Sequence, residues 1–270
     1  AMATVAAALP EVFMGRKTDA VSSQLRARFE LLNAGVHGMK NLTQKLDHFD
    51  SSNTNTWDQR YFFNHEYVKP DTNVNILYIC GEQSNSLKTV VDDTKSYVYY
   101  AKQLSGDLYS FEHRFYGRSH PTKDTSVESL QYLSSMQAIE DIAEFIRQIN
   151  AQKGGGDQKW ITIGGSYSGA LSAWARLKHP ELIAGSVASS APILAQVDFY
   201  GYLQTVDEEF KKHGGLCYDQ IRDAFDAAQN LIQSEEGRAT LADIFQITPP
   251  FSAYDEITPY DIETFFSQLT

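Results

Sequence analysis

Apolar residues in the middle of the chain fall into short unbroken runs and longer amphipathic stretches. The runs predict buried strands, and the stretches with apolar residues three or four apart predict helices. Strand and helix alternate from residue 74 to 188, which predicts right-handed βαβ units and a mostly parallel α/β sheet covered on both faces. The predicted strands are Val74–Cys80, Asp107–His113, Ile161–Ile163 and Ile183–Ala188, and the predicted helices are Val90–Leu104, Met136–Ile149 and Ala170–Lys178. Ser134 and Gln137 form a capping box before the second helix.

The chain before this region shows two other patterns. Leu46–Val68 has a β-like pattern in which aromatic residues occupy alternate positions, at Trp57, Tyr61 and Phe63. Residues 20–33 have the apolar spacing of an amphipathic helix. That helix is expected on the surface, or alternatively in a pro-segment that precedes a mature start near Lys40.

Charge divides the chain near residue 200. Residues 201–270 contain 13 Asp and Glu residues but only 4 Lys and Arg residues. Most of the chain's net charge of -11 therefore lies in this part. After Pro192 the predicted strands stop, and an amphipathic helix is predicted between Cys217 and Ile232. We therefore expect an N-terminal segment at 1–39, an α/β domain at 40–198 and a helical domain at 199–270.

The composition excludes several classes of protein. It is globular, with 42% hydrophobic and 21% charged residues. The negative net charge argues against nucleic acid or an anionic membrane surface as the main partner. No stretch approaches the roughly 18 apolar residues of a membrane span. No His/Cys cluster has metal-ligand spacing and no Gly-rich loop fits phosphate, so neither a metal nor a cofactor is expected.

Cysteine usage and one sequon bear on the cellular compartment. Cys80 ends a predicted core strand while Cys217 begins an acidic helix, so a buried free thiol, or a partner outside this chain, is favoured over a bond between them. Asn41, in Asn41-Leu42-Thr43, is the expected glycosylation site. The first residues, Ala1–Val5, contain no signal peptide, and removal of a natural leader is expected.

The strongest chemical signal is a serine between a predicted strand and a predicted helix. The stretch Trp160–Gly169 passes from β-branched residues through Gly164 and Gly165 to Ser166. Such a tight turn holds a serine hydroxyl clear of the backbone, where a base can take its proton and helix amides can face an oxyanion. Ser166 is therefore the candidate nucleophile of an acyl-transfer site, and a structural Gly-rich turn is the alternative.

The residues around Ser166 suggest how such a site is completed. Ser168 replaces the last glycine of a Gly-x-Ser-x-Gly motif and is expected to pack or to cap the helix. The oxyanion hole is predicted to use the N–H of Tyr167 and a second N–H, of Glu82 or Gln83, in the loop after the Val74–Cys80 strand. An ordinary surface turn is the alternative for that loop.

No histidine of this chain suits the role of base. In α/β-hydrolases the acid and the histidine follow the serine, and only His179 and His213 follow Ser166. His179 lies 13 residues beyond Ser166, about 20 Å along the predicted helix. Both are expected to be solvated surface residues. His113, at the end of an earlier strand, is expected to be structural or to line a pocket.

Several motifs together resemble one family, the lysosomal and secreted serine exopeptidases that include Pro-Xaa carboxypeptidase, dipeptidyl peptidase II and thymus-specific serine protease. The motifs occur in order between about residues 40 and 200, and the last two are most similar to the thymus-specific branch. They are Gln44–Phe49, Gln59–Phe62, Glu112–Ser119, Gly164–Trp174, Ala175–Pro180 and Ser186–Pro192.

The resemblance implies an α/β-hydrolase core interrupted by a helical cap, with Ser166 as nucleophile. It also implies peptide substrates, often with proline next to the scissile bond, and a secreted or a lysosomal or vacuolar location. Family members are nearly twice as long, with their catalytic Asp and His beyond the cap. The chain therefore resembles an N-terminal portion, with an incomplete hydrolase core over 40–198 and the start of the cap over 199–270.

The function expected from these observations is that of a serine exopeptidase, either a carboxypeptidase or a dipeptidyl-peptidase, that forms an acyl-enzyme on Ser166. The isolated chain should turn over little substrate, because it lacks triad members. One alternative is a catalytically inactive, truncated peptide-binding or regulatory protein, and another is a serine esterase or lipase. A homodimer is one open oligomeric state.

Overall fold

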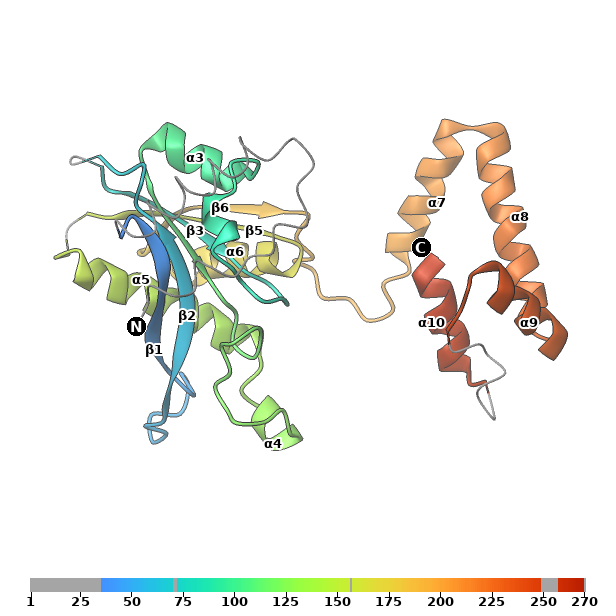
Figure 1. Cartoon of the computed structure of the whole chain (residues 1–270), viewed down its shortest axis with the longest axis horizontal. Coiled ribbons are helices and arrows are strands. Elements are labelled where there is room, and N and C mark those ends of the chain that lie inside the picture. Colours follow the sequence, from blue (N-terminus) through green and yellow to red (C-terminus); the bar gives the residue numbers. More distant parts are fainter. Residues whose placement is uncertain (1–34, 70–71, 156, 249–256, 270) are drawn as a thin grey trace, which may run out of the picture. The chain divides into compact units, whose positions relative to one another are not determined.

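The computed structural model describes residues 35–69, 72–155, 157–248 and 257–269. The chain divides between Ala195 and Gln196 into two compact units, an α/β unit and a helical unit (Figure 1). The helix expected over residues 20–33, with its alternative as a pro-segment, lies outside the described residues.

A six-stranded mixed sheet forms the centre of the α/β unit, in the order β1-β2-β4-β3-β5-β6. The pairs β1–β2 and β2–β4 are antiparallel, whereas β4, β3, β5 and β6 run parallel. The strands are β1 (His37–Lys45), β2 (Thr56–Asn64), β3 (Val74–Ile79), β4 (Asp107–Phe111), β5 (Lys159–Gly165) and β6 (Ile183–Ser189). The mostly parallel α/β sheet expected from the sequence is confirmed.

Helices cover both faces of this sheet (Figure 1). Because successive side chains of a strand point to opposite faces, β3 contributes to two cores. Leu77 and Ile79 enter the core beneath the pair α5 and α6, whereas Ile76 and Tyr78 belong to the core beneath α2 and α3. The helices of this unit are α2 (Lys88–Val91), α3 (Ser96–Leu104), the short α4 (Val127–Leu130), α5 (Ser135–Gln152) and α6 (Tyr167–Lys178).

Strand β1 was not predicted, because much of what it buries is polar. Its buried residues are His37, Leu42 and Gln44. The side chain of Gln44 donates a hydrogen bond to that of Gln59 on β2, at 2.8 Å. Hydrophobic periodicity cannot detect a strand in which two of the three buried residues are polar.

The β-like pattern over Leu46–Val68 corresponds to a strand only over Thr56–Asn64. The residues before it form a polar turn, in which the side chains of Asp50 and Asn53 each accept a bond from the backbone N–H two residues ahead. Such Asx turns compete with strand pairing. The extended region was therefore predicted too long at its start.

The helix predicted over Val90–Leu104 is interrupted by a turn. The side chain of Asp92 accepts bonds from the N–H and the hydroxyl of Thr94, at 3.1 and 2.7 Å, and these bonds end α2 before α3 begins.

Of the two hydrogen bonds of the capping box predicted before α5, the structure contains only one. Ser134 accepts the N–H of Gln137 at 3.2 Å, but the Gln137 side chain instead donates to Asp47, at 2.6 Å.

A buried ionic cluster joins three parts of the α/β unit. Arg114, in the segment after β4, donates two bonds of 2.7 Å to Asp141 on α5. His48, in the turn after β1, lies 2.7 Å from the same carboxylate. The Arg114 side chain is fully buried and also donates to the carbonyls of Leu46 and Tyr132. One buried carboxylate thus fixes the β1 turn, the segment after β4 and α5.

The helical unit has a small core of its own. Its helices are α7 (Gly201–His213), α8 (Gly215–Leu231), α9 (Glu235–Ile244) and α10 (Pro259–Leu269). The core includes Ala228, Ile232, Leu241 and Phe265, so the amphipathic helix predicted after Cys217 is confirmed as α8. Helices α7 and α8 also border a largely apolar groove of about 540 Å³.

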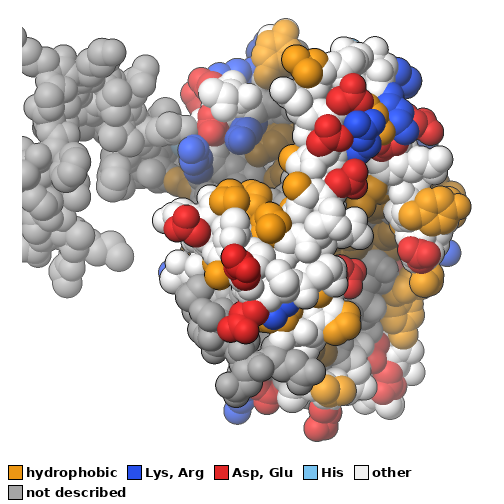
Figure 2. Space-filling view, turned by 90° about the vertical axis from the view of Figure 1, so that its right-hand side faces the viewer, with side chains coloured by type: hydrophobic (Ala, Val, Ile, Leu, Met, Phe, Trp, Pro, Cys, Tyr) orange, Lys and Arg blue, Asp and Glu red, His pale blue; other side chains and the backbone are white. Residues whose placement is uncertain are grey.

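The described residues also show which side chains with predicted roles are exposed. In the view of Figure 2, hydrophobic and acidic side chains lie interspersed. In the part of the chain that the structure describes, no helix has the length and apolar character needed to cross a membrane. Asn41 lies exposed on the edge strand β1. Cys80 is a buried free thiol, and Cys217 is an exposed one.

We predict that Asp141→Asn lowers the unfolding free energy by about 3–5 kcal/mol, because it leaves the buried Arg114 guanidinium without its counter-charge. Urea unfolding of the chain measures this. Asp93→Asn is the matched control, since Asp93 pairs with Lys102 at the surface; its cost should stay below about 1 kcal/mol. Equal costs for the two variants would contradict the structural role of Asp141.

Candidate active site

Ser166 lies on a sharp turn between the end of β5 and the start of α6. Its backbone has φ 56° and ψ −132°, a conformation that L-residues rarely adopt. The residue is exposed, and no described residue forms a hydrogen bond with its hydroxyl. Strained backbone of this kind is often retained where it positions a reacting group. The turn thus presents a free hydroxyl at the carboxyl end of a central strand.

Two glycines allow the helix to begin so close to the sheet. A Cβ on Gly164 would lie 2.1 Å from the carbonyl oxygen of Ser168, and a Cβ on Gly169 would lie 2.9 Å from that of Ser189. The N–H of Ser166 donates to the same Ser189 oxygen at 3.0 Å. The turn is therefore held against the ends of both β5 and β6.

The hydroxyl of Ser168 is turned inward and fully engaged. It donates to the carbonyl of Gly165 at 2.8 Å and accepts from the N–H of the same residue at 3.2 Å. The residue is buried, so it braces the turn from inside. The N-cap position of α6 is occupied by Ser166 rather than by Ser168. Of the two serines, only Ser166 presents its hydroxyl to solvent.

The loop after β3 lies beside this turn, as the predicted oxyanion hole requires. A Cβ on Gly81 would lie 3.6 Å from Cβ of Ser168, so the two backbones are close. The N–H of Gln83 donates to the carbonyl of Gly81 at 2.9 Å. The N–H of Glu82, in contrast, has no hydrogen-bond partner among the described residues. Tyr167 begins α6, so its N–H has no partner within the helix.

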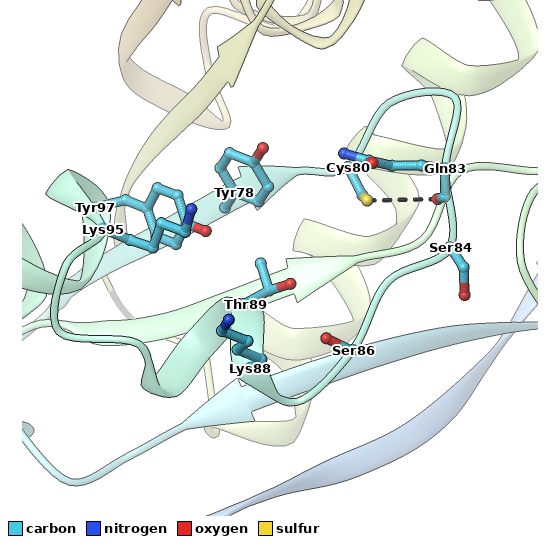
Figure 3. Close-up of a pocket in the computed structure, with 9 residues that line it drawn as sticks. All are labelled: Tyr78, Cys80, Gln83, Ser84, Ser86, Lys88, Thr89, Lys95 and Tyr97. Atoms are coloured by element: carbon cyan, nitrogen blue, oxygen red, sulfur yellow. Dashed lines mark hydrogen bonds between the residues drawn. The ribbon is translucent and has the colours of Figure 1, made fainter.

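A polar cavity of about 240 Å³ is lined in part by this loop, at Gln83 and Ser84 (Figure 3). The thiol of Cys80 faces the carbonyl of Gln83 at 3.6 Å, and the rings of Tyr78 and Tyr97 stack with centroids 4.2 Å apart. Burial raises the pKa of the Cys80 thiol to about 11. Cys80 is therefore protonated at neutral pH and unsuited to act as a nucleophile.

His113 contacts the residue that follows Ser166. Its Nδ1 lies 2.7 Å from the carbonyl of Arg114 and therefore carries a proton, so its Nε2 accepts the Tyr167 hydroxyl at 3.1 Å. Burial lowers the pKa of His113 and raises that of Tyr167 to about 12. Both groups are thus neutral at physiological pH. The structural role expected for His113 agrees with these contacts.

The other two histidines considered as bases lie elsewhere. His179 ends α6 and is mostly buried, with Nε2 2.9 Å from a carboxylate oxygen of Glu140 on α5. The expectation that it is solvated was wrong, because it bridges two neighbouring helices. His213 is exposed at the end of α7. No described histidine contacts Ser166 by a hydrogen bond.

Sequence reasoning missed a buried carboxylate next to the candidate oxyanion loop. Glu112 directly follows β4, and its side chain is fully buried. It accepts bonds from Arg60 on β2, from the N–H of Asn85 and from the hydroxyl of Ser119. Burial would raise the pKa of this carboxyl, but these donors hold it below its ordinary value. The Glu112–Ser119 motif was identified, but a motif alone does not reveal which loop its acid binds.

We predict that Glu112→Gln changes the pH dependence of stability. The depressed pKa of Glu112 means that its stabilisation is complete above its unfolded-state value of 4.5 and is lost as pH falls through the lower folded-state pKa. Urea unfolding between about pH 6 and about pH 3 should show a shallower fall in unfolding free energy for the variant. Parallel curves for wild type and variant would contradict an ionised Glu112.

We also predict that Gly164→Ala destabilises the chain by at least about 2 kcal/mol, because the added methyl overlaps the backbone of Ser168. Gly185→Ala on β6 is the matched control, since the nearest atom to its new Cβ is 4.0 Å away. Thermal unfolding of both variants measures the difference. A tolerated alanine at 164 would mean that the turn is not packed as described.

Comparison with known proteins places these features in a family. The profile of the family described as serine carboxypeptidase S28 matches residues 44–270. A Caenorhabditis elegans protein named as a serine protease, F56F10.1, is 41% identical over 237 residues, 88% of this chain and 43% of the relative. Human lysosomal Pro-X carboxypeptidase is 32% identical over 78% of this chain and 44% of its own. Mouse thymus-specific serine protease is 38% identical over 72% and 38%.

Among solved structures, an esterase from Pyrococcus furiosus has a TM-score of 0.42 at 14% identity, covering 69% of this chain and 60% of that one. A thioesterase domain from the curacin biosynthetic pathway has a TM-score of 0.40 at 13% identity, covering 64% and 52%.

The chain spans somewhat less than half the length of the curated relatives it matches. The expected preference for the thymus-specific branch was wrong, because C. elegans serine proteases match at higher identity over more of the chain. The six-stranded mixed sheet and the strand–serine–helix turn are those of an α/β-hydrolase. With a family match over most of its length, this chain belongs to the serine carboxypeptidase S28 family of peptidases.

Proposed function

We propose that this chain carries the nucleophile and the oxyanion-hole amides of a serine exopeptidase. The observation that supports this most directly is the exposed, unpartnered hydroxyl of Ser166 on the strained turn between β5 and α6. Ser166 Oγ attacks the carbonyl carbon of the scissile peptide bond while a base takes its proton. The tetrahedral intermediate then collapses to an acyl-enzyme as the amine leaves with that proton, and water releases the acyl group.

The oxyanion of that intermediate is held by two backbone amides. Tyr167 N–H, in the first turn of α6, is one donor. Glu82 N–H is preferred over Gln83 N–H for the second, because the latter already donates to Gly81. Two such fixed donors, with the helix dipole behind one of them, stabilise charge where it develops. Each donor of this kind contributes about 100- to 1000-fold to kcat.

The catalytic His and Asp are assigned to the part of the parent protein outside this chain. Two facts support this: the match covers only 43–44% of these relatives' length, and no described histidine contacts Ser166 by a hydrogen bond. In this assignment, residues 40–198 form the N-terminal part of the hydrolase domain and residues 199–270 the start of a helical cap.

The substrates are proposed to be peptides with proline near the scissile bond. The name of the related Pro-X carboxypeptidases carries this specificity, together with a lysosomal location. We extend both to the parent protein, as a secreted or lysosomal peptidase. Exposed Asn41 on β1 would then carry a glycan, because it lies at the surface on an edge strand of the sheet.

A fluorophosphonate probe tests the nucleophile in the full-length parent protein. We predict that the probe labels Ser166 and that Ser166→Ala abolishes both labelling and prolyl-peptide hydrolysis, because the attacking oxygen is removed. Peptide mapping by mass spectrometry identifies the labelled residue. Ser190→Ala is the matched control, since Ser190 is also an exposed serine with positive φ, just after β6.

Each alternative to the proposed function predicts a different result in these experiments. Labelling that persists in Ser166→Ala, or loss of labelling in Ser190→Ala alone, would place the nucleophile elsewhere. Hydrolysis of a simple acyl ester at least as efficient as that of a prolyl peptide, by kcat/KM, would reassign the same site to an esterase. A parent protein that neither labels nor hydrolyses either substrate would overturn the proposed serine-hydrolase function.

A further inference from the structure

Glu112 lies where it can control the second oxyanion donor. It is the first residue after β4, and β4 neighbours β3, whose loop carries Glu82. Its side chain is fully buried, yet no substrate group is needed to explain its ionisation. The donors to this carboxylate include Arg60, Ser84, Asn85, Arg118 and Ser119. A buried carboxylate with this many donors has a fixed position and also fixes the segments that donate to it.

One oxygen of Glu112 binds the candidate oxyanion loop. Oε1 accepts the N–H of Asn85 at 2.8 Å and lies within 3.4 Å of the Ser84 hydroxyl. Arg60, paired with the same carboxylate, donates to the carbonyl of Asn85 at 3.1 Å. Both backbone groups of Asn85 are therefore bound to one ion pair.

The other oxygen of Glu112 binds the segment that follows β4. Oε2 accepts the hydroxyl of Ser119 at 2.8 Å and the N–H of Arg118 at 3.0 Å. Gly117 has a φ of +61°, and a Cβ there would lie 1.9 Å from Oε1. The segment thus wraps closely around the carboxylate, which leaves it little freedom to move.

The oxyanion loop is consequently fixed at both ends. At its start, the N–H of Cys80 donates to the carbonyl of Phe111 at 3.3 Å. At its end, Asn85 is held by Glu112 and Arg60, and its side-chain amide donates to the Ser110 hydroxyl at 2.8 Å. Glu82 lies between these anchors, with its N–H unpartnered among the described residues. The direction of that N–H depends on where the two anchors hold the loop.

We propose that Glu112 is a positioning residue for the oxyanion hole: it orients the loop that carries the Glu82 N–H toward the oxyanion formed at Ser166. This inference rests on the proposed peptidase function. Glu112 touches no reacting atom, and its effect is transmitted through Asn85. Because the loop matters most when negative charge develops, loss of Glu112 acts on the acylation rate rather than on substrate binding.

The test uses Glu112→Gln in the full-length parent protein. The variant keeps the volume of the side chain, but it replaces an oxygen acceptor with an NH₂ group that cannot accept the N–H donors. We expect kcat for a prolyl peptide to fall at least about 100-fold while KM changes less than about threefold. The rate of fluorophosphonate labelling of Ser166 should fall in parallel, since the phosphonyl oxygen occupies the same hole.

Asp107→Asn is the matched control. Asp107 is also a nearly buried carboxylate of β4, and it is bound to Lys153 and His65. It lies at the amino end of the strand, whereas Ser166 lies at the carboxyl end of the parallel strand β5. Its loss should lower thermal stability while kcat at a temperature well below unfolding stays near that of wild type. Glu112→Asp provides the conservative variant, which keeps the charge but withdraws the oxygens, and its kcat should lie between those of wild type and Glu112→Gln.

The outcomes distinguish this inference from the proposed function. A wild-type parent protein without labelling or hydrolysis overturns the proposed function itself. An active wild type whose Glu112→Gln variant loses no more kcat than Asp107→Asn, or loses it through KM, overturns the positioning role alone. Where Glu112→Gln does not fold, Glu112→Asp carries the same test, with a selective fall in kcat of at least about 10-fold supporting the role and an unchanged kcat overturning it.

Discussion

The contact between the first turn of α6 and the ends of β5 and β6 is the constraint on which the candidate site depends. The helix can begin there only because Gly164 and Gly169 lack side chains where backbone carbonyls pass within van der Waals distance. The resulting geometry forces Ser166 to a positive φ, which costs on the order of 1–3 kcal/mol locally. That cost is offset by the bond from Ser166 N–H to Ser189 and by the inward bonds of Ser168. The strained backbone of Ser166 is therefore stabilised by hydrogen bonds that its neighbours and the end of β6 make with the turn.

Two buried ion pairs from one short segment supply the rigidity that this turn requires. Glu112 turns toward β2 and the loop after β3, where it meets Arg60, whereas Arg114 turns toward α5, where it meets Asp141. Burying such charges costs several kcal/mol per ion unless nearly every lone pair and proton finds a partner. Both pairs meet that condition with additional backbone donors or acceptors. In this arrangement the segment after β4 and the loop after β3 are joined by hydrogen bonds to the same buried charges.

The sequence predicted most of the α/β unit because its central strands are apolar and its long helices strongly periodic. The same reasoning failed where polar groups decide the structure. Strand β1 was missed because Gln44 is buried in a hydrogen bond, and the helix before Leu104 was predicted as continuous because the Asp92 turn has no apolar signature. For the site, Ser166 could be predicted from a local motif. The role of Glu112 could not, because its partners Asn85 and Arg60 lie 27 and 52 residues away in sequence, and only the sheet order brings them together.

The contacts of His113 leave it unable to act as a general base toward Ser166. Its Nδ1–H is bound to the Arg114 carbonyl, so its remaining nitrogen is the only acceptor, and that acceptor is occupied by the Tyr167 hydroxyl. A general base needs a free acceptor directed at the serine proton and a partner that stabilises its positive charge. His113 has no free acceptor, and burial disfavours its protonated form. It instead accepts the hydroxyl of Tyr167, the residue that follows Ser166, and thereby joins the segment after β4 to the first turn of α6.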